Sequence, residues 1–167
     1  MARTFEAAAL VATALCLSSL LGFAYGQEQF SVIGKVYCDT CRVDFETKAS
    51  YGLADSKVRL ECHNRTSGVL TLSAEAVTDK SGEYKLVIDG DHEEEICELQ
   101  LVESSDPECS SLLEGAVHNA RVALTNKNGV AQAVRYANPL AFTKKESLPN
   151  CKQVLIDMGV FPLDLGY

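Results

Sequence analysis

The sequence has no long basic segment, and this absence narrows the classes of partner. The longest run of basic residues is the pair Lys144-Lys145, and acidic residues outnumber basic ones by 23 to 15. Nucleic acids and anionic lipids are bound by clusters of Lys and Arg, which a chain with a net charge of −8 does not offer. We therefore expect no nucleic-acid partner. After residue 26 there is also no apolar run long enough to span a bilayer.

Local catalytic signatures are absent too. The three histidines, His63, His92 and His118, lie in no nucleophile elbow, H-E-x-x-H pattern or Gly-rich phosphate loop. A catalytic triad can be assembled from distant residues, so an enzyme remains an alternative. Nothing local marks a nucleophile, however, and we expect a non-enzyme without catalytic residues or cofactor. Internal repeats, low-complexity segments and an interdomain linker are missing as well, which indicates one domain.

The first 26 residues have the layout of a secretory signal peptide. Arg3 gives a basic start, residues 7–23 are uncharged and mostly apolar, and Ala24-Tyr25-Gly26 places small residues at a cleavage site. A signal anchor is the alternative, since an uncharged run of roughly 20 residues can span a bilayer. We expect cleavage after residue 26. The protein is then secreted to the extracellular space without a membrane anchor, as a single β-domain of residues 27–167.

Cysteine is plentiful. Cys16 lies in the predicted signal peptide, and an even number of cysteines follows it: Cys38, Cys41, Cys62, Cys97, Cys109 and Cys151. In a secreted chain this predicts three disulfides, with fifteen connectivities that spacing alone does not distinguish. Cys38 and Cys41 are too close for an easy mutual bridge in an extended chain, so we expect each to bond a distant cysteine.

Alternation of apolar and polar residues predicts about seven short strands, with little helix. They cover residues 30–38, 57–63, 69–78, 84–88, 97–101, 120–124 and 130–136. The turn Asp79-Lys80-Ser81-Gly82 predicts a hairpin over residues 69–89, and residues 43–56 are expected to form a loop. A helical turn is expected within residues 107–118, and a short helix within residues 148–158. The pattern indicates an all-β, antiparallel sandwich or small barrel with three disulfides and a short C-terminal helical tail.

Cys38-Asp39-Thr40-Cys41 also has the spacing of a thioredoxin-like redox pair or half of a zinc site. Redox chemistry needs a low-pKa thiolate, usually at the start of a helix, but residues 42–47 form a poor amphipathic helix. Structural zinc needs a second ligand pair at similar spacing, and Cys97 and Cys109 are too far apart to supply it. The sequence favours structural disulfides and no metal site.

Two loops carry further candidate sites. Residues 89–95, between two predicted strands, concentrate acidic side chains, which suit calcium. Their spacing does not match an EF-hand, so a solvated acidic loop is the favoured interpretation. Asn64-Arg65-Thr66 is an N-glycosylation sequon in a predicted loop, and we expect a glycan on Asn64.

The stretch Gly34-Lys35-Val36-Tyr37-Cys38-Asp39-Thr40-Cys41-Arg42 resembles the secreted plant pollen proteins typified by the major olive pollen allergen, and in particular the pollen-specific members of tomato and maize. The resemblance covers essentially all of residues 27–167. Supporting segments are residues 45–47, 77–84, 90–92, 96–98, 134–140 and Phe161-Pro162-Leu163.

This resemblance implies a disulfide connectivity, which the cysteine spacing alone could not give. It pairs Cys38 with Cys109, Cys41 with Cys151, and Cys62 with Cys97, within a β-rich barrel or sandwich. It also implies a non-catalytic role in pollen hydration, germination and tube growth, with a receptor-kinase ectodomain or a cell-wall component as partner. The alternative is a secreted protease or hydrolase inhibitor, although no exposed Lys/Arg loop braced by adjacent cysteines is evident.

Overall fold

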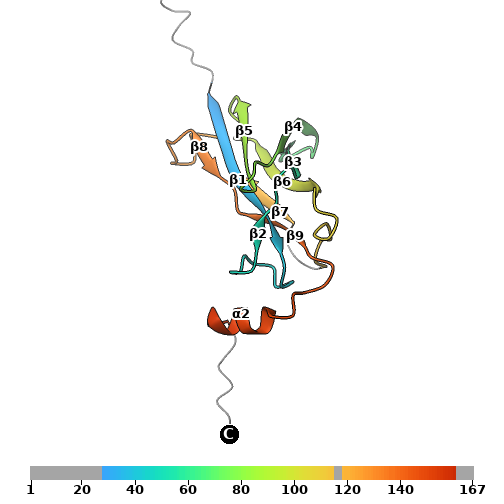
Figure 1. The fold of residues 1–167 in the computed structure, drawn as a ribbon. Coiled ribbons are helices and arrows are strands. Elements are labelled where there is room, and N and C mark those ends of the chain that lie inside the picture. The colour runs from blue at the N-terminus through green and yellow to red at the C-terminus, as the bar shows by residue number, and fades with distance from the viewer. Residues whose placement is uncertain (1–27, 115–117, 161–167) are drawn as a thin grey trace, which may run out of the picture.

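The computed structural model describes residues 28–114 and 118–160 (Figure 1). The predicted signal peptide and the supporting segment Phe161-Pro162-Leu163 lie outside these residues. The described elements are β1 (Gln29–Asp39), β2 (Tyr51–Gly52), β3 (Lys57–Asn64), β4 (Leu70–Val77), β5 (Glu83–Asp89), β6 (Glu95–Glu103), β7 (Asn119–Val122), β8 (Val134–Tyr136), β9 (Leu140–Thr143) and α2 (Cys151–Asp157). No helix in the described residues is both long and apolar enough to cross a membrane.

The strands form two sheets, and the long strand β1 is the axis of the first (Figure 1). The first half of β1 is flanked by β5, antiparallel, and by β8, parallel. Its second half is flanked by β2, antiparallel, and by β9, parallel. The second sheet has the order β4-β3-β6-β7 and is antiparallel throughout. The expected mostly-β fold with three disulfides and one short C-terminal helix is confirmed.

The core lies between the two sheets and follows the period of two that the sequence predicts. Phe30, Val32 and Val36 of β1 are fully buried, as are Val58 and Leu60 of β3, while the residues between them are partly exposed. Each fully buried side chain of this size contributes about 1.5–3 kcal/mol. The core therefore fixes which face of each strand points outward, and with it the residues that a partner can reach.

The predicted hairpin over residues 69–89 is wrong. β4 pairs with β3 and β5 pairs with β1, so the connection between them crosses from one sheet to the other. The turn itself forms as expected, with the Asp79 Oδ1 accepting hydrogen bonds from the N–H groups of Ser81 (2.8 Å) and Glu83 (3.0 Å). Gly82, at φ 83°, lies directly against the Val36 carbonyl, where a Cβ would overlap it. The turn is thus held against β1 instead of closing a ladder between β4 and β5.

Several other expectations need correction. The first sheet is mixed, because β8 and β9 run parallel to β1, whereas a purely antiparallel arrangement was expected. The predicted strand over residues 130–136 forms only at its end, β9 lies in a segment for which no strand is predicted, and β2 lies within the expected loop 43–56. In the described part of residues 107–118 a turn and a single bridge, Ser111 to Thr143, replace the helical turn. The helix expected within residues 148–158 forms as α2.

Candidate functional site

The cysteines of the Gly34–Arg42 motif are each tied to a distant segment. The structure joins Cys38 to Cys109 and Cys41 to Cys151, over 71 and 110 residues of sequence. Cys62 is joined to Cys97, its direct neighbour across β3 and β6. These are the pairs that the family resemblance implies. Cys38 and Cys41 therefore share neither a redox disulfide nor a metal, and they fasten the end of β1 to the rest of the domain.

Asp39, between these cysteines, organises the loop that follows β1. Its side chain is fully buried. Oδ1 accepts a hydrogen bond from the Cys41 N–H (3.1 Å), and Oδ2 accepts from the N–H groups of Val43 (2.7 Å) and Asp44 (2.8 Å). A carboxylate that accepts several backbone hydrogen bonds is strongly held. It stabilises the left-handed backbone of Arg42 (φ 58°) and Asp44 (φ 61°).

Arg42 is turned towards its own chain. Its guanidinium donates hydrogen bonds to the carbonyls of Lys144 (2.6 Å) and Lys145 (3.2 Å), just after β9. An inhibitory loop would present such a basic side chain to a protease. Here the basic residue beside the disulfides instead links the two ends of the domain, so the motif as a whole is structural.

Asn64 ends β3 and begins an exposed loop of residues 65–69. Its Oδ1 accepts hydrogen bonds from the N–H groups of Thr66 and Ser67, both at 3.0 Å. The amide nitrogen, which would carry a glycan, donates none to the described residues. This geometry leaves the sequon accessible at the surface, and glycosylation itself stays a prediction.

Two carboxylates of the acidic loop between β5 and β6 are paired with a lysine of the same chain. The Nζ of Lys127 lies 2.9 Å from the Oδ2 of Asp91 and 2.6 Å from the Oε2 of Glu93. The hydrogen bond from Lys127 contributes most to holding the pKa of Asp91 below its usual range, and the hydrogen bond to Glu93 contributes most to raising the pKa of Lys127. The lysine ammonium thus occupies the position between carboxylates that a cation would take.

One cluster has the residue types of a metal site but not the free ligands. The ligand atoms of Cys62, His92, Glu95 and Cys97 lie within 4.8 Å of one another. Both sulfurs are bonded to each other in a disulfide, so neither is a thiolate, the form that binds metals. His92 Nδ1 and Glu95 Oε2 are paired with each other at 2.8 Å. Only two free ligands remain, fewer than the three or four protein ligands of a zinc site.

The remaining histidines assemble no catalytic group in the parts of the chain that the structure describes. His118 Nε2 lies 2.7 Å from the carbonyl of Leu113, and His63 is the next-to-last residue of β3 and is partly exposed. No described histidine makes a hydrogen bond to a serine, threonine or cysteine side chain, which is the contact that activates such nucleophiles.

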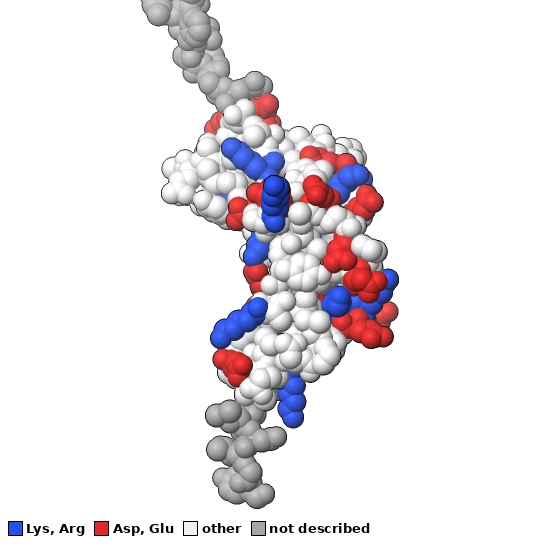
Figure 2. Space-filling model, viewed as in Figure 1, with Lys and Arg blue, Asp and Glu red and all other residues white. Residues whose placement is uncertain are grey.

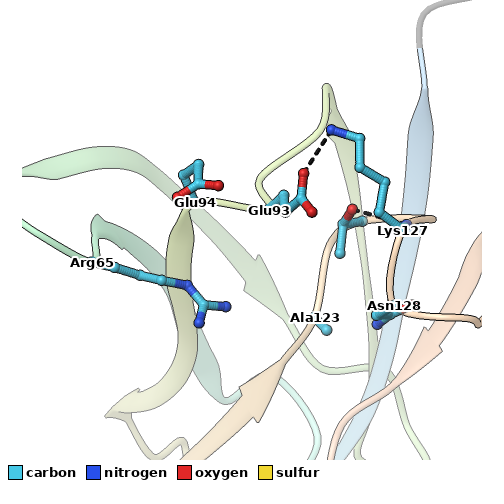
Figure 3. Close-up of a pocket in the computed structure, with 7 residues that line it drawn as sticks. Arg65, Glu93, Glu94, Ala123, Lys127 and Asn128 are labelled. Atoms are coloured by element: carbon cyan, nitrogen blue, oxygen red, sulfur yellow. Dashed lines mark hydrogen bonds and ion pairs between the residues drawn. The ribbon is translucent and has the colours of Figure 1, made fainter.

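Three loops at one end of the sandwich enclose a shallow hollow of about 360 Å³. They are the connections β3–β4, β5–β6 and β7–β8, and they contribute Arg65, Glu93, Glu94, Ala123, Thr125, Lys127 and Asn128 (Figure 3). The Arg65 side chain extends into the hollow, whereas Lys127 is engaged by Glu93. Arg65 makes no ion pair with the described residues. A ligand with acceptor atoms could therefore bind Arg65 without breaking an existing bond.

Arg135, for which the sequence alone predicts no role, shapes the third of these loops. It is the buried residue of β8, and its guanidinium lies 4.8 Å from the ring centroid of Phe30. It donates hydrogen bonds to the carbonyls of Ala123 (2.8 Å), Thr125 (2.7 Å) and Val130 (3.1 Å). The only signal in the sequence is its place among apolar residues of the predicted strand 130–136, because an arginine buried there requires buried acceptors.

Charge is mixed over the surface that Figure 2 shows. Acidic and basic side chains alternate across it, and no continuous basic area appears on this face. The arrangement agrees with the absence of basic segments in the sequence. Binding that depends on phosphate charges would need a concentrated basic surface.

Comparisons with known proteins agree with this architecture. The family model described as "Pollen protein Ole e 1 like" matches residues 28–159. An Olee1-like protein of Betula pendula is 51% identical, covering 92% of this chain and 94% of that protein. The anther-specific protein LAT52 of Solanum lycopersicum is 46% identical, covering 94% and 98%.

A solved structure supports the same assignment. The major plantain pollen allergen Pla l 1 aligns with a TM-score of 0.66 and 32% identity, covering 74% of this chain and 99% of that one. The family match spans both sheets, all six disulfide-bonded cysteines and α2. The chain is a member of the Ole e 1-like family of pollen proteins.

Proposed function

We propose that this chain is a secreted, non-catalytic protein of pollen. It acts in the extracellular space as a ligand or cell-wall-associated factor in pollen hydration, germination and tube growth. Curated relatives at 44–51% identity are described as an Olee1-like protein, an anther-specific protein, pollen allergens and a pollen-specific protein-like chain. This supports a role in pollen that depends on binding.

The observation that carries the proposal is the loop-end hollow built on a disulfide-braced scaffold. Cys62–Cys97 lies beneath the loops that contribute Arg65 and Glu93, and Arg135 holds the loop that contributes Lys127. Loops that are fixed before binding lose less conformational entropy when a partner docks. A rigid polar surface with one unpaired guanidinium suits recognition of a partner, and no nucleophile–base pair accompanies it in the described residues.

We place the partner among receptor-kinase ectodomains or cell-wall components. The net charge of −8 favours a partner with a basic surface, because complementary charge accelerates association. Within the hollow, Arg65 supplies a positive charge, which would bind a carboxylate or another oxygen-rich group of the partner.

The test is direct binding of oxidised mature protein to a panel of pollen receptor-kinase ectodomains and wall polysaccharide fractions, measured by surface plasmon resonance. We expect saturable binding to at least one of them. Arg65→Ala keeps the Asn64-x-Thr66 sequon and should weaken that binding about tenfold. Lys152→Ala, on the exposed face of α2 away from these loops, is the matched control and should bind like wild type.

Two results would contradict the proposal. No binding to the whole panel would exclude the ligand or wall role, and equal losses in both variants would exclude the loop end as the contact surface. Secretion is tested separately by expressing the full chain in plant cells. The medium should contain protein whose N-terminal residue is Gln27, whereas a membrane-retained chain that keeps residues 1–26 would indicate a signal anchor.

A further inference from the structure

The strand β4 has an unpaired edge. It is the outer strand of the four-stranded sheet, hydrogen-bonded only to β3, and no described strand pairs with its other side (Figure 1). Its ladder with β3 is regular from Leu72 to Val77, and a bulge near its start leaves Thr71 without a partner, since Cys62 faces Leu72 and His63 faces Leu70. Its outer side thus presents backbone groups ready to pair with another strand.

Beyond the bulge at its start, this edge lacks the features that usually prevent pairing between chains. Exposed edge strands commonly carry lysine, proline or several charges. β4 has no lysine, proline or glycine, and its one charged residue, Glu75, is bound by Arg59, with the Arg59 Nη2 2.7 Å from Oε1. The outer strand of the other sheet, β5, differs, because Glu83, Lys85 and Asp89 are all exposed along it.

Apolar side chains concentrate at the two ends of β4. Val69 is 60% exposed, Leu70 is 48% exposed, and Val77 is 56% exposed. Leu72, Ala74 and Ala76 face the core but are only partly buried against it. One more strand along this edge would cover both groups of side chains.

We propose that β4 pairs with β4 of a second copy of this chain, antiparallel, about a two-fold axis beside Ser73. In this register Leu72 faces Ala74 of the second copy, and Glu75 lies opposite the bulge at Thr71. The two sheets become one continuous sheet with its apolar face on one side. Such self-complementary two-fold contacts are the commonest form of association between identical chains.

The charges on the strand favour a second copy and this register. Each Glu75 lies opposite the uncharged bulge at Thr71, and the two Glu75 residues are separated by about four positions along the strand, about 13 Å. That distance exceeds the screening length of about 8 Å at physiological ionic strength, so their repulsion is small. Centring the axis on Ala74 would halve this separation. Charge repulsion between two copies is therefore small at this edge, even though the whole chain is acidic.

A hollow beside the strand accepts the end of the second copy. The register places Val69 of that copy opposite Val77. There a hollow of about 340 Å³ has an apolar part formed by Ile33, Val77 and Tyr84 and a charged rim of Asp79, Glu83 and Lys85. The exposed valine would enter this hollow, which increases the apolar area removed from water.

The test is sedimentation of the oxidised mature protein from about 1 µM to about 1 mM. We expect a concentration-dependent dimer. Ser73→Lys places two like charges opposite each other at the axis and should weaken dimerisation about tenfold or more. Val87→Lys introduces the same charge at an exposed position of β5 and should dimerise like wild type. A monomer at every concentration, or equal behaviour of the two variants, would overturn the proposal.

A cross-link tests the register independently. Directly opposed residues of an antiparallel pair are close enough for a disulfide, so Ser73→Cys should give a covalent dimer through the introduced thiol alone. Val87→Cys, folded and oxidised in the same way, should stay monomeric. Peptide mapping checks that the three native disulfides are intact in both. A covalent dimer of the Val87 variant, or none of the Ser73 variant, would contradict pairing at this edge.

Discussion

At the scale of single residues, the most consequential polar contact is the one that Asp39 makes at the end of β1. Three backbone N–H groups converge on one buried carboxylate, in a loop where two residues take left-handed backbone conformations. Without an acceptor these N–H groups would be shielded from water and unpaired, which is costly. Asp39 therefore explains why the segment between the two cysteines is polar.

Replacing Asp39 tests this role. Asp39→Ala should lower the free energy of unfolding by about 3 kcal/mol, because three charge-assisted hydrogen bonds are lost. Asp39→Asn should cost less, since one acceptor oxygen remains. Urea unfolding with the disulfides intact gives the values. Asp44→Asn, at an exposed position whose φ of 61° asparagine tolerates, is the control and should stay within about 0.5 kcal/mol of wild type.

At the scale of elements, the structure separates what local patterns can predict from what they cannot. The inward faces of β1, β3 and β5 follow from alternation, because each strand has one face on the core. Alternation does not predict which strands pair with each other. The Asp79–Gly82 turn, for example, has the same chemistry whether it closes a hairpin or crosses between sheets. β8 and β9 are only three and four residues long, and their parallel pairing with β1 depends on contacts about 100 residues away in sequence.

The candidate site also has parts that the sequence can predict and parts that it cannot. The sequon at Asn64 and the acidic loop can be recognised from short segments. The hollow cannot, because Arg65 and Lys127 come from loops that only the folded sheets bring together. Arg135 was missed because its acceptors are backbone carbonyls, which leave no pattern in the side chains.

Substitution of Arg135 should disturb one loop more than the whole fold. Arg135→Lys keeps the charge but cannot reach three carbonyls at once, and we expect a loss of about 2 kcal/mol. Amides of residues 124–131 should exchange hydrogen faster, while those of β3 and β6 stay protected. Hydrogen exchange followed by mass spectrometry measures both. Arg121→Lys, whose side chain is 68% exposed, is the control, and equal exchange in the two variants would show that Arg135 does not hold the loop.

At the scale of the whole molecule, three surface carboxylates in different loops make the stability of the fold sensitive to acid. The pKa of Asp91 is held below its usual range, chiefly by the hydrogen bond from Lys127. The pKa of Asp79 is lowered by its hydrogen bonds to Ser81, and that of Asp106 by its hydrogen bond from Tyr51. For each group the stabilisation is complete above the unfolded pKa of about 4 and is lost as the pH falls through the lower folded pKa.

We therefore expect the free energy of unfolding to decrease as the pH is lowered from about 5 to about 2. Asp91→Asn removes one of the contributing groups and should make the decrease shallower, with no difference in slope from wild type near neutral pH. Urea unfolding at a series of pH values measures this. A variant with the same slope as wild type below about pH 4 would show that the Lys127 contact does not stabilise the ionised form.

The long separation of Cys41 from Cys151 also constrains how the protein is made. A chain synthesised from its N-terminus presents Cys41 well before its partner, 110 residues later. Cys62 and Cys97 are 35 residues apart and can bond while the second sheet forms. Until Cys151 has been synthesised, Cys41 must stay reduced or exchange out of a temporary disulfide. The last native cross-link therefore closes only when α2 has emerged, so a chain truncated before Cys151 leaves one thiol without its partner.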